Sequence, residues 1–181
     1  FLSFKIIHVL LFLFLTSTLQ TFAEEPVPQQ FIDSKIIEKI GHHIPFDMVM
    51  TDDKGNEYEL GSYFNSGQPV IINLIYYSCP MLCNILVSGL LDSIEGWGEY
   101  PGNKYKVLSI SFDPRDTSET ATQFRKKNFL NRDPKLNGNW ELLTTSEENI
   151  DKIKSALGFR VVYDDAIQEF AHSAAIILVS P

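Results

Sequence analysis

The sequence predicts an α/β fold in which helices flank a central mixed sheet and a β-hairpin precedes that sheet. Two apolar stretches that are rich in β-branched residues, 70–76 and 105–112, have the length and composition of buried strands. The first is followed by a segment whose apolar residues recur at helical spacing, and the second by a residue pair typical of a helix start. Because strands that alternate with helices along a chain form parallel pairs, we expect helices on both faces of the sheet.

The first 23 residues are predicted to be a secretory signal peptide and not part of the fold. Lys5 is their only charge, residues 6–15 form a short apolar core, and small residues at 21 and 23 have the usual cleavage spacing. The apolar run is short for a membrane span, which needs about 20 residues, so an uncleaved N-terminal anchor is the alternative. We therefore expect an exported protein, in the periplasm or at the outer face of the inner membrane.

The rest of the chain is predicted to be a linker followed by one domain. Residues 24–40 begin polar with two prolines and are expected to form a linker that includes a short helix. Residues 41–181 are expected to form the domain, incomplete at its C-terminal end because the sequence stops in an apolar run. All 23 acidic and 14 of the 15 basic residues follow residue 23, which gives a net charge of −9. Such an acidic chain does not suit nucleic acid, whose phosphates need Lys and Arg.

The predicted strands are short, and each is either apolar throughout or alternates between apolar and polar residues. Residues 46–50 and 58–60 flank the polar cluster 52–56, which is typical of a hairpin turn. A second hairpin is expected around Asp164 and Asp165, with a second arm that continues unbroken through the final apolar run. In chain order, the predicted strands cover residues 46–50, 58–60, 70–76, 105–112, 140–143, 159–163 and 168–179.

The predicted helices begin and end at residues with known positional preferences. Pro80 is expected at the first position of the helix after the central strand, where its missing N–H costs nothing. Gly158 is expected to end the last helix. The other two helix starts show pairs typical of a capping box, Asp116 with Glu119 and Thr145 with Glu148. The predicted helices cover about 80–95, 117–130 and 146–157, and residues 137–139 are expected to form a loop.

Cys79 and Cys83 are the only cysteines of the chain, and they follow directly after the central predicted strand. Residues four apart on a helix share one face, and the positive end of the helix dipole favours thiolates there. Such a pair could hold a soft metal ion, or it could close into a disulfide and exchange with other thiols. Two buried structural cysteines or a simple structural disulfide are the alternatives. The carboxyl end of a central strand is where α/β sheets place their sites, which favours a functional pair.

Three separated motifs make the chain resemble the Sco/SenC family, in its bacterial Cys-Pro-Met-Leu-Cys branch. The similarity extends from about residue 41 to the end, and the motifs occur in the family's order. They are Cys79-Pro80-Met81-Leu82-Cys83, Ser111-Phe112-Asp113-Pro114-Arg115-Asp116-Thr117 and Phe170-Ala171-His172-Ser173. The resemblance implies a thioredoxin-like fold and one copper ion, Cu(I) or Cu(II), bound by Cys79, Cys83 and His172.

The ligand set that the resemblance implies agrees with copper chemistry, because thiolates select Cu(I) and an added imidazole suits Cu(II). By itself, His172 in an apolar segment is more often a core histidine. Zinc is less favoured, since structural zinc sites normally have four protein ligands. Asp113 and Asp116 match an acidic segment that the family places near the metal, and helix capping is the simpler role for Asp116. His42 and His43 are adjacent in a predicted loop and point apart, so we expect exposed loop histidines there.

The resemblance implies a copper metallochaperone that delivers copper to, or assists assembly of, the copper-A centre of cytochrome c oxidase. Its implied partners are cytochrome c oxidase subunit II and a copper donor protein. The alternative is a thiol–disulfide oxidoreductase in which Cys79 attacks and Cys83 resolves, so that partner cysteines stay reduced. Thioredoxins have two residues between their cysteines, and the three found here suit metal capture better. A peroxidase-like function ranks lowest, because residues 76–78 lack the pattern that precedes a peroxidatic cysteine.

Overall fold

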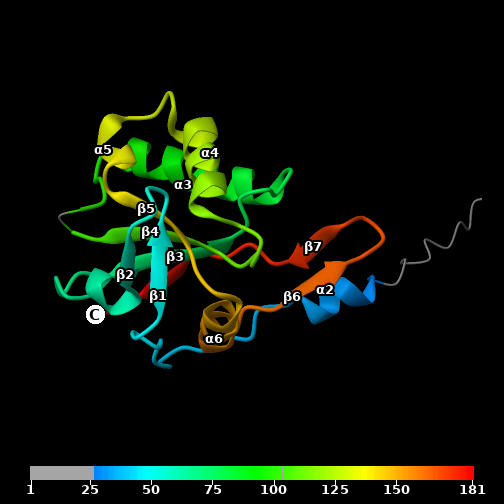
Figure 1. Ribbon diagram of the computed structural model, residues 1–181. Coiled ribbons are helices and arrows are strands. Elements are labelled where there is room, and N and C mark those ends of the chain that lie inside the picture. Colours follow the sequence, from blue (N-terminus) through cyan, green and yellow to red (C-terminus); the bar gives the residue numbers. More distant parts are fainter. Residues whose placement is uncertain (1–26, 103) are drawn as a thin grey trace, which may run out of the picture.

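The computed structural model describes residues 27–102 and 104–181, and its centre is a six-stranded mixed sheet (Figure 1). The strand order is β2-β1-β5-β4-β3-β8. β3, β4 and β5 are mutually parallel, and the other neighbours pair antiparallel. The strands are β1 (Val49–Asp52), β2 (Glu57–Glu59), β3 (Val70–Ile75), β4 (Lys106–Ser111), β5 (Trp140–Thr144) and β8 (Ile177–Val179). The predicted α/β class and mixed central sheet are confirmed, whereas the predicted signal peptide, residues 1–23, lies outside the described residues.

Helices cover both faces of the sheet. α3 (Leu82–Trp97) and α4 (Ser118–Phe129) lie on one face, and α6 (Glu147–Leu157) lies on the opposite side (Figure 1). α3 and α4 each connect two neighbouring parallel strands, and right-handed crossovers in one direction along a sheet place both helices on the same face. The short helices are α2 (Gln29–Asp33), the 3-10 helix η1 (Leu60–Tyr63) and α5 (Pro134–Asn137).

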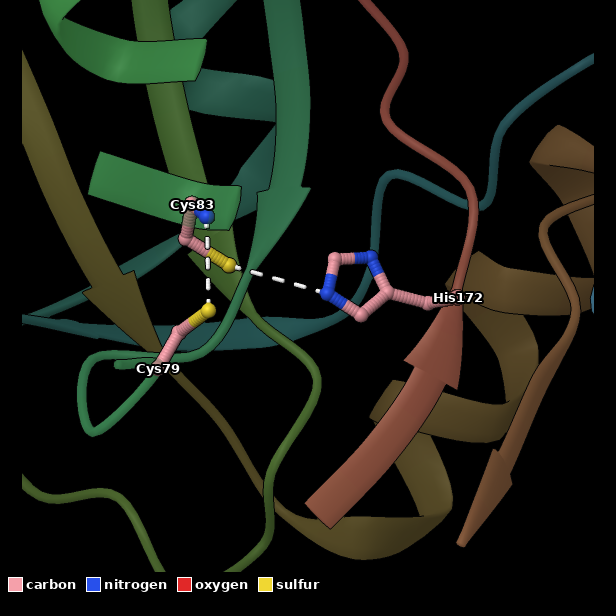
Figure 2. Close-up of side chains that lie close together, drawn as sticks. All are labelled: Cys79, Cys83 and His172. Carbon is pink, nitrogen blue, oxygen red and sulfur yellow. Dashed lines mark hydrogen bonds between the residues drawn. The ribbon is translucent and has the colours of Figure 1, made fainter. Parts of the chain in front are cut away.

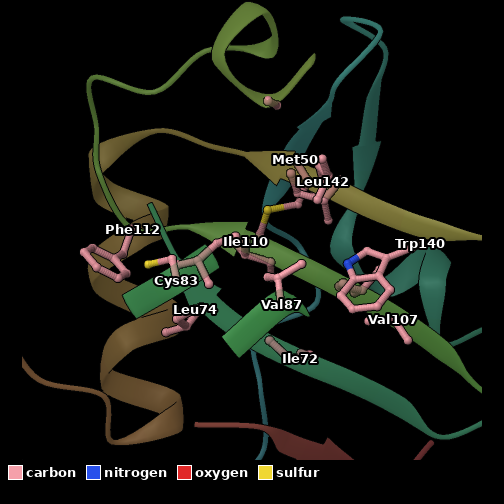
Figure 3. Close-up of a cluster of buried hydrophobic side chains, with 14 of the residues drawn as sticks. Met50, Ile72, Leu74, Cys83, Val87, Val107, Ile110, Phe112, Trp140 and Leu142 are labelled. Atoms are coloured by element: carbon pink, nitrogen blue, oxygen red, sulfur yellow. The ribbon is translucent and has the colours of Figure 1, made fainter. Parts of the chain in front are cut away.

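The core forms where α3 packs on the two central strands. Figure 3 shows Cys83 and Val87 of α3 among Ile72, Leu74 and Ile110 of β3 and β4. All five side chains are essentially excluded from solvent. Full burial of one aliphatic side chain of this size stabilises the fold by about 1.5–3 kcal/mol. The first turn of α3, which carries one of the cysteines, is therefore anchored in the core.

The N-terminal hairpin is confirmed, with its first strand three residues later than predicted. β1 begins at Val49 and pairs antiparallel with β2. The Asp52 carboxylate accepts the backbone N–H groups of Lys54 (2.9 Å) and Asn56 (2.8 Å), which fixes the turn between the two strands. A short helix in the predicted linker is also confirmed, because α2 occupies residues 29–33.

Both predicted capping boxes are wrong by one residue. Thr117, and not Asp116, caps α4, in a reciprocal pair with Thr120. Ser146, and not Thr145, caps α6 by accepting the N–H of Asn149. In each case the residue expected to cap is bonded to another part of the fold. The Asp116 carboxylate bonds to buried groups near the cysteines, and the Thr145 hydroxyl donates to the Val49 carbonyl (2.6 Å).

α5 replaces part of the loop that was expected before β5. Asp133 caps this single turn by accepting the N–H of Lys135 (2.9 Å), and Pro134 stands at its first position. Leu136 is buried, which anchors the turn in the core. The Asp-Pro pair is a helix-start signal, so the turn could have been read from the sequence. Gly158 ends α6 in the left-handed conformation, as predicted.

The predicted continuous arm over residues 168–179 is wrong. β6 (Val161–Asp164) and β7 (Glu169–His172) form a separate two-stranded sheet, and the chain leaves it after His172. β8 then pairs antiparallel with β3 at the edge of the main sheet. The backbone groups along that edge of β3 would otherwise lack partners next to a buried strand. The break is therefore the consequence of completing the main sheet.

Candidate metal centre

Cys79 lies in the loop between β3 and α3, held by hydrogen bonds at three of its atoms. Its N–H donates to the Tyr76 carbonyl (3.2 Å), and its carbonyl accepts from Asn84 Nδ2 (2.8 Å). Its Sγ accepts the backbone N–H of Cys83 (3.3 Å), so the sulfur satisfies one of the unpaired donors in the first turn of α3. Because Cys79 folds back onto that turn, Pro80 lies in a bend and α3 begins at Leu82, two residues later than predicted.

Cys83 is the second residue of α3, and only 1% of its surface is exposed. Its position in the core fixes the direction of its side chain (Figure 3). Its Sγ lies 3.8 Å from Nε2 of His172, a residue 89 positions further along the chain (Figure 2). Both cysteines are free thiols.

His172 is the last residue of β7 and turns its ring toward the two thiols (Figure 2). Its Nδ1 lies 3.0 Å from the carbonyl oxygen of Ser173. Since a carbonyl can only accept, this contact places the proton of a neutral imidazole on Nδ1. Nε2 then carries the free lone pair, and it is the nitrogen that faces Cys83. This is the arrangement that metal-binding histidines use.

The ring of His172 stands among aromatic side chains that fix its plane. Edge-on contacts join it to Tyr76 and Phe112, with ring centroids 5.7 and 5.0 Å away, and the Phe159 ring lies at 6.1 Å. These rings come from the ends of β3, β4 and α6, so the histidine is oriented by all three elements. Tyr76 is also buried, and burial raises the pKa of its phenol.

The two thiols differ in acidity because they interact with each other. The hydrogen bond from Cys83 lowers the pKa of Cys79, and His172 acts in the same direction. The same interaction with Cys79, together with burial, raises the pKa of Cys83. The backbone N–H of Cys83 also donates to the Cys79 sulfur, so Cys79 is the thiol that ionises more readily. The sequence predicted thiolate character from the helix dipole, whereas the main cause here is the neighbouring thiol.

The structure brings together the three residues that the sequence singled out. One ligand atom from each of Cys79, Cys83 and His172 lies within 4.8 Å of the others, close enough to share one ion. Within residues 27–102 and 104–181, no other group of three or more Cys, His, Asp or Glu side chains has that geometry. His42 and His43 are exposed and do not belong to it. Two thiols and one imidazole are soft to borderline ligands, which fit copper better than magnesium or calcium.

The acidic segment after β4, Asp113 to Asp116, forms buried contacts next to the cysteine loop. The Asp116 carboxylate accepts the N–H of Tyr77 (2.8 Å) and the hydroxyl of Ser111 (2.5 Å), and burial raises its pKa. Asp113 is buried in a two-pronged ion pair with Arg115, with 2.7 Å between Oδ2 and Nη2. No sequence pattern indicated these contacts, nor the aromatic side chains and the Ser173 carbonyl around His172. The motif Ser111 to Thr117 contains five of these residues, Ser111, Phe112, Asp113, Arg115 and Asp116, but it does not record the direction of their side chains.

These features define a class of protein: a thioredoxin-like α/β domain in which two thiols and one imidazole meet at the end of the central strand. The family model for SCO1/SenC matches residues 38–181. The chain therefore belongs to the SCO1/SenC family. A comparison with curated protein sequences gives no match.

Solved structures agree with the fold. The chain is 27% identical to a putative electron transfer protein from Aquifex aeolicus, with a TM-score of 0.66 over 77% of this chain and 78% of that one. Arabidopsis thaliana ScoI, solved with copper bound, is 21% identical, with a TM-score of 0.59 over 74% and 78%. BsSco, a Sco-family cytochrome c oxidase assembly protein with a disulfide switch, is 17% identical, with a TM-score of 0.59 over 80% and 81%. At these two lower identities the likeness concerns the fold alone.

Proposed function

We propose that this protein binds one copper ion through Cys79, Cys83 and His172 and delivers it to the copper-A centre of cytochrome c oxidase subunit II, or assists assembly of that centre. The observation that carries the proposal is the convergence of two thiols and a metal-ready imidazole from distant parts of the chain. Family membership and the copper-bound ScoI structure support the choice of copper. We further propose an exported, periplasmic location and a separate copper donor protein. In the described part of the chain, no helix has the length and apolar character that a membrane span requires.

Each ligand has a distinct part in the transfer. Cys79 is the thiol that the structure favours as thiolate, so it is the first to meet incoming copper. Cys83 is fixed in the core and loses its proton when the ion binds. His172 comes from the separate hairpin and adds the nitrogen that Cu(II) prefers. Because three protein ligands leave the ion open on one side, thiols of an acceptor can replace them one at a time.

A second candidate function is thiol–disulfide exchange, favoured by the opposite pKa shifts of the two free cysteines. The Cys79 thiolate would attack one sulfur of a partner disulfide and release the other as a thiolate. Cys83 would then lose its proton and attack Cys79, which would release the second partner thiolate and leave a Cys79–Cys83 disulfide. The partner gains two electrons, and this protein loses two. Such a reaction would keep the copper-ligand cysteines of an oxidase subunit reduced.

Titration of the reduced protein with each copper ion tests the first proposal. Chelator competition measures Cu(I), and sulfur-to-copper charge-transfer absorption follows Cu(II). We expect one tightly bound equivalent of copper, lost in Cys79→Ala and Cys83→Ala. His172→Ala should abolish tight binding of Cu(II), since it removes the nitrogen ligand. His42→Ala is the matched control, because it removes an exposed histidine outside the ligand group.

Two outcomes would contradict the proposal. Unchanged copper stoichiometry and affinity in His172→Ala would remove that residue from the ligand set. Absence of tight copper binding, together with a fast-exchanging disulfide, would favour the thiol reductase. If copper does bind, incubation with the soluble copper-A domain of a subunit II should transfer it, seen as the absorption of the copper-A centre.

A further inference from the structure

The hairpin that carries His172 is not part of the main sheet, so its position depends on contacts with other segments of the chain. β6 and β7 bond to each other, and neither is hydrogen-bonded in the six-stranded sheet. In Figure 1 this hairpin stands beside the main body, with α2 lying along it. A ligand at the end of such a hairpin reaches the two cysteines only when the hairpin is held in place.

The segment before the domain supplies several of the contacts that hold the hairpin. We call residues 29–37 the N-terminal strap. Gln30 Nε2 donates to Asp164 Oδ2 at the end of β6 (3.1 Å). The carbonyl of Ser34, which is buried in the strap, accepts the hydroxyl of Ser173 (2.9 Å). The sequence predicted a linker with a short helix here, and in the structure this segment packs against the hairpin.

Ser173 joins the strap to the ligand histidine. Its hydroxyl donates to the Ser34 carbonyl, and its own carbonyl accepts the Nδ1–H of His172 (3.0 Å). We propose that the N-terminal strap, acting through Ser173, completes the positioning of a His172 ring whose plane Tyr76, Phe112 and Phe159 already fix, and thereby sets how firmly the third ligand is held. This inference rests on the proposed copper-binding function. With the strap docked, Nε2 faces Cys83; with the strap released, the hairpin keeps no hydrogen bond to residues 29–37 and the two thiols remain in the core.

Release of the strap should affect the two oxidation states of copper differently. Cys79 and Cys83 are held by β3, α3 and the core, independently of the strap. Two thiolates are enough for Cu(I), whereas Cu(II) needs the imidazole. The strap should therefore govern Cu(II) affinity and leave Cu(I) affinity nearly unchanged. This difference separates a positioning role from general destabilisation, which would weaken both.

Gly158 offers a single-residue means of releasing the strap. Its carbonyl accepts the N–H of Ile37 (2.8 Å), and a Cβ at this position would lie 1.8 Å from the Ile37 carbonyl oxygen. Gly158→Ala must therefore displace the strap. Gly98 is the matched control: it also ends a helix in the left-handed conformation (φ 77°, against 66° for Gly158), but a Cβ there meets nothing within 4 Å. The backbone strain of an alanine is common to both variants, and only one of them touches the strap.

The experiment compares the wild-type protein with Gly158→Ala, Ser173→Ala and Gly98→Ala. We expect the affinity for Cu(II) to fall by about tenfold in the first two, since each loses a contact equivalent to at least one hydrogen bond. The affinity for Cu(I) should stay within about twofold in all three. A long-range proton–nitrogen NMR spectrum of the metal-free protein adds a readout that needs no copper. It should show His172 protonated at Nδ1 in the wild type and in Gly98→Ala, and a mixture of tautomers in the other two.

The outcomes separate this inference from the proposed function. Equal loss of Cu(II) affinity in Gly98→Ala and Gly158→Ala would overturn the inference, because the strap would then be irrelevant. An unchanged His172 tautomer in both Gly158→Ala and Ser173→Ala would also overturn it. Absence of copper binding in the wild type would refute the proposed function, while the tautomer measurement would still test the strap. If Gly158→Ala fails to fold, Ser173→Ala alone carries both readouts.

Discussion

Asp116 is a buried carboxylate that fixes the chain just before the cysteine loop. It accepts the N–H of Tyr77 at 2.8 Å and the hydroxyl of Ser111 at 2.5 Å, and both donors lie in residues excluded from solvent. Tyr77 is only two residues before Cys79, so this carboxylate connects the end of β4 to the start of the cysteine loop. Replacing Asp116 tests which role this residue has. It is either an acceptor in the buried hydrogen-bond network or the cap of the helix that follows, as the sequence predicted.

The expected loss of stability follows from two buried donors that lose their acceptor, the Tyr77 N–H and the Ser111 hydroxyl. Each buried donor without a partner costs about 1–3 kcal/mol. Removal of the carboxylate also relieves the unfavourable burial of a charge, which offsets part of this cost. We therefore expect Asp116→Ala to lower the free energy of unfolding by about 2–5 kcal/mol at neutral pH. Asp116→Asn keeps one acceptor oxygen, so it should cost about 1–2 kcal/mol.

Urea unfolding of the reduced, metal-free protein measures these values, with equal m-values as the check that the unfolded state is unchanged. The pH dependence gives a second test. Because burial raises the pKa of Asp116, the folded state binds the proton more tightly than the unfolded chain. The contribution of Asp116 to stability is then fully present below the ordinary carboxyl pKa and is lost as the pH rises through the raised pKa. Asparagine does not titrate, so Asp116→Asn should cost more at about pH 4 than at about pH 7.

Glu119→Gln is the matched control. Glu119 is exposed and is the residue that the sequence paired with Asp116 in a capping box, but Thr120 has that role in the structure. We expect its replacement to change the free energy of unfolding by less than about 0.5 kcal/mol. A larger loss in Glu119→Gln than in Asp116→Ala would refute the reasoning. So would an Asp116→Ala variant as stable as the wild type.

Two further predictions concern the redox state of the cysteines and an ion pair outside the site. Air oxidation of the metal-free protein should join Cys79 and Cys83 in a disulfide, since the two Sγ atoms already lie within 4.8 Å of each other; two thiols still titratable afterwards would count against this. Arg125→Met should lower the free energy of unfolding, measured in urea, by about 3–5 kcal/mol, because it leaves the buried Asp53 carboxylate without its cation. A loss below about 1 kcal/mol would show that this ion pair contributes no more than an exposed one.

The sequence was a good guide to the elements and a poorer guide to their ends. Apolar runs and helical spacing located β3, α3, β4 and α6, because these patterns depend on neighbours along the chain. The caps were misassigned by one residue, since Asp116 and Thr145 have a capping residue type but bond to distant backbone groups. The break between β7 and β8 was missed because it depends on the open edge of β3, which no local pattern records.

By itself, the sequence determined the class of fold, the cysteine pair at the end of the central strand and, through its motifs, the histidine that is proposed as the third ligand. Only the tertiary structure decided which nitrogen of His172 faces the thiols, which cysteine is the stronger acid, and that residues 29–37 hold the hairpin. The physical reason is distance along the chain: Cys83 and His172 are 89 residues apart, and Ser34 and Ser173 are 139 apart. Contacts of that span exist only after the sheet has fixed its strand order, because it is the folded sheet that brings the hairpin, the strap and the cysteine loop together.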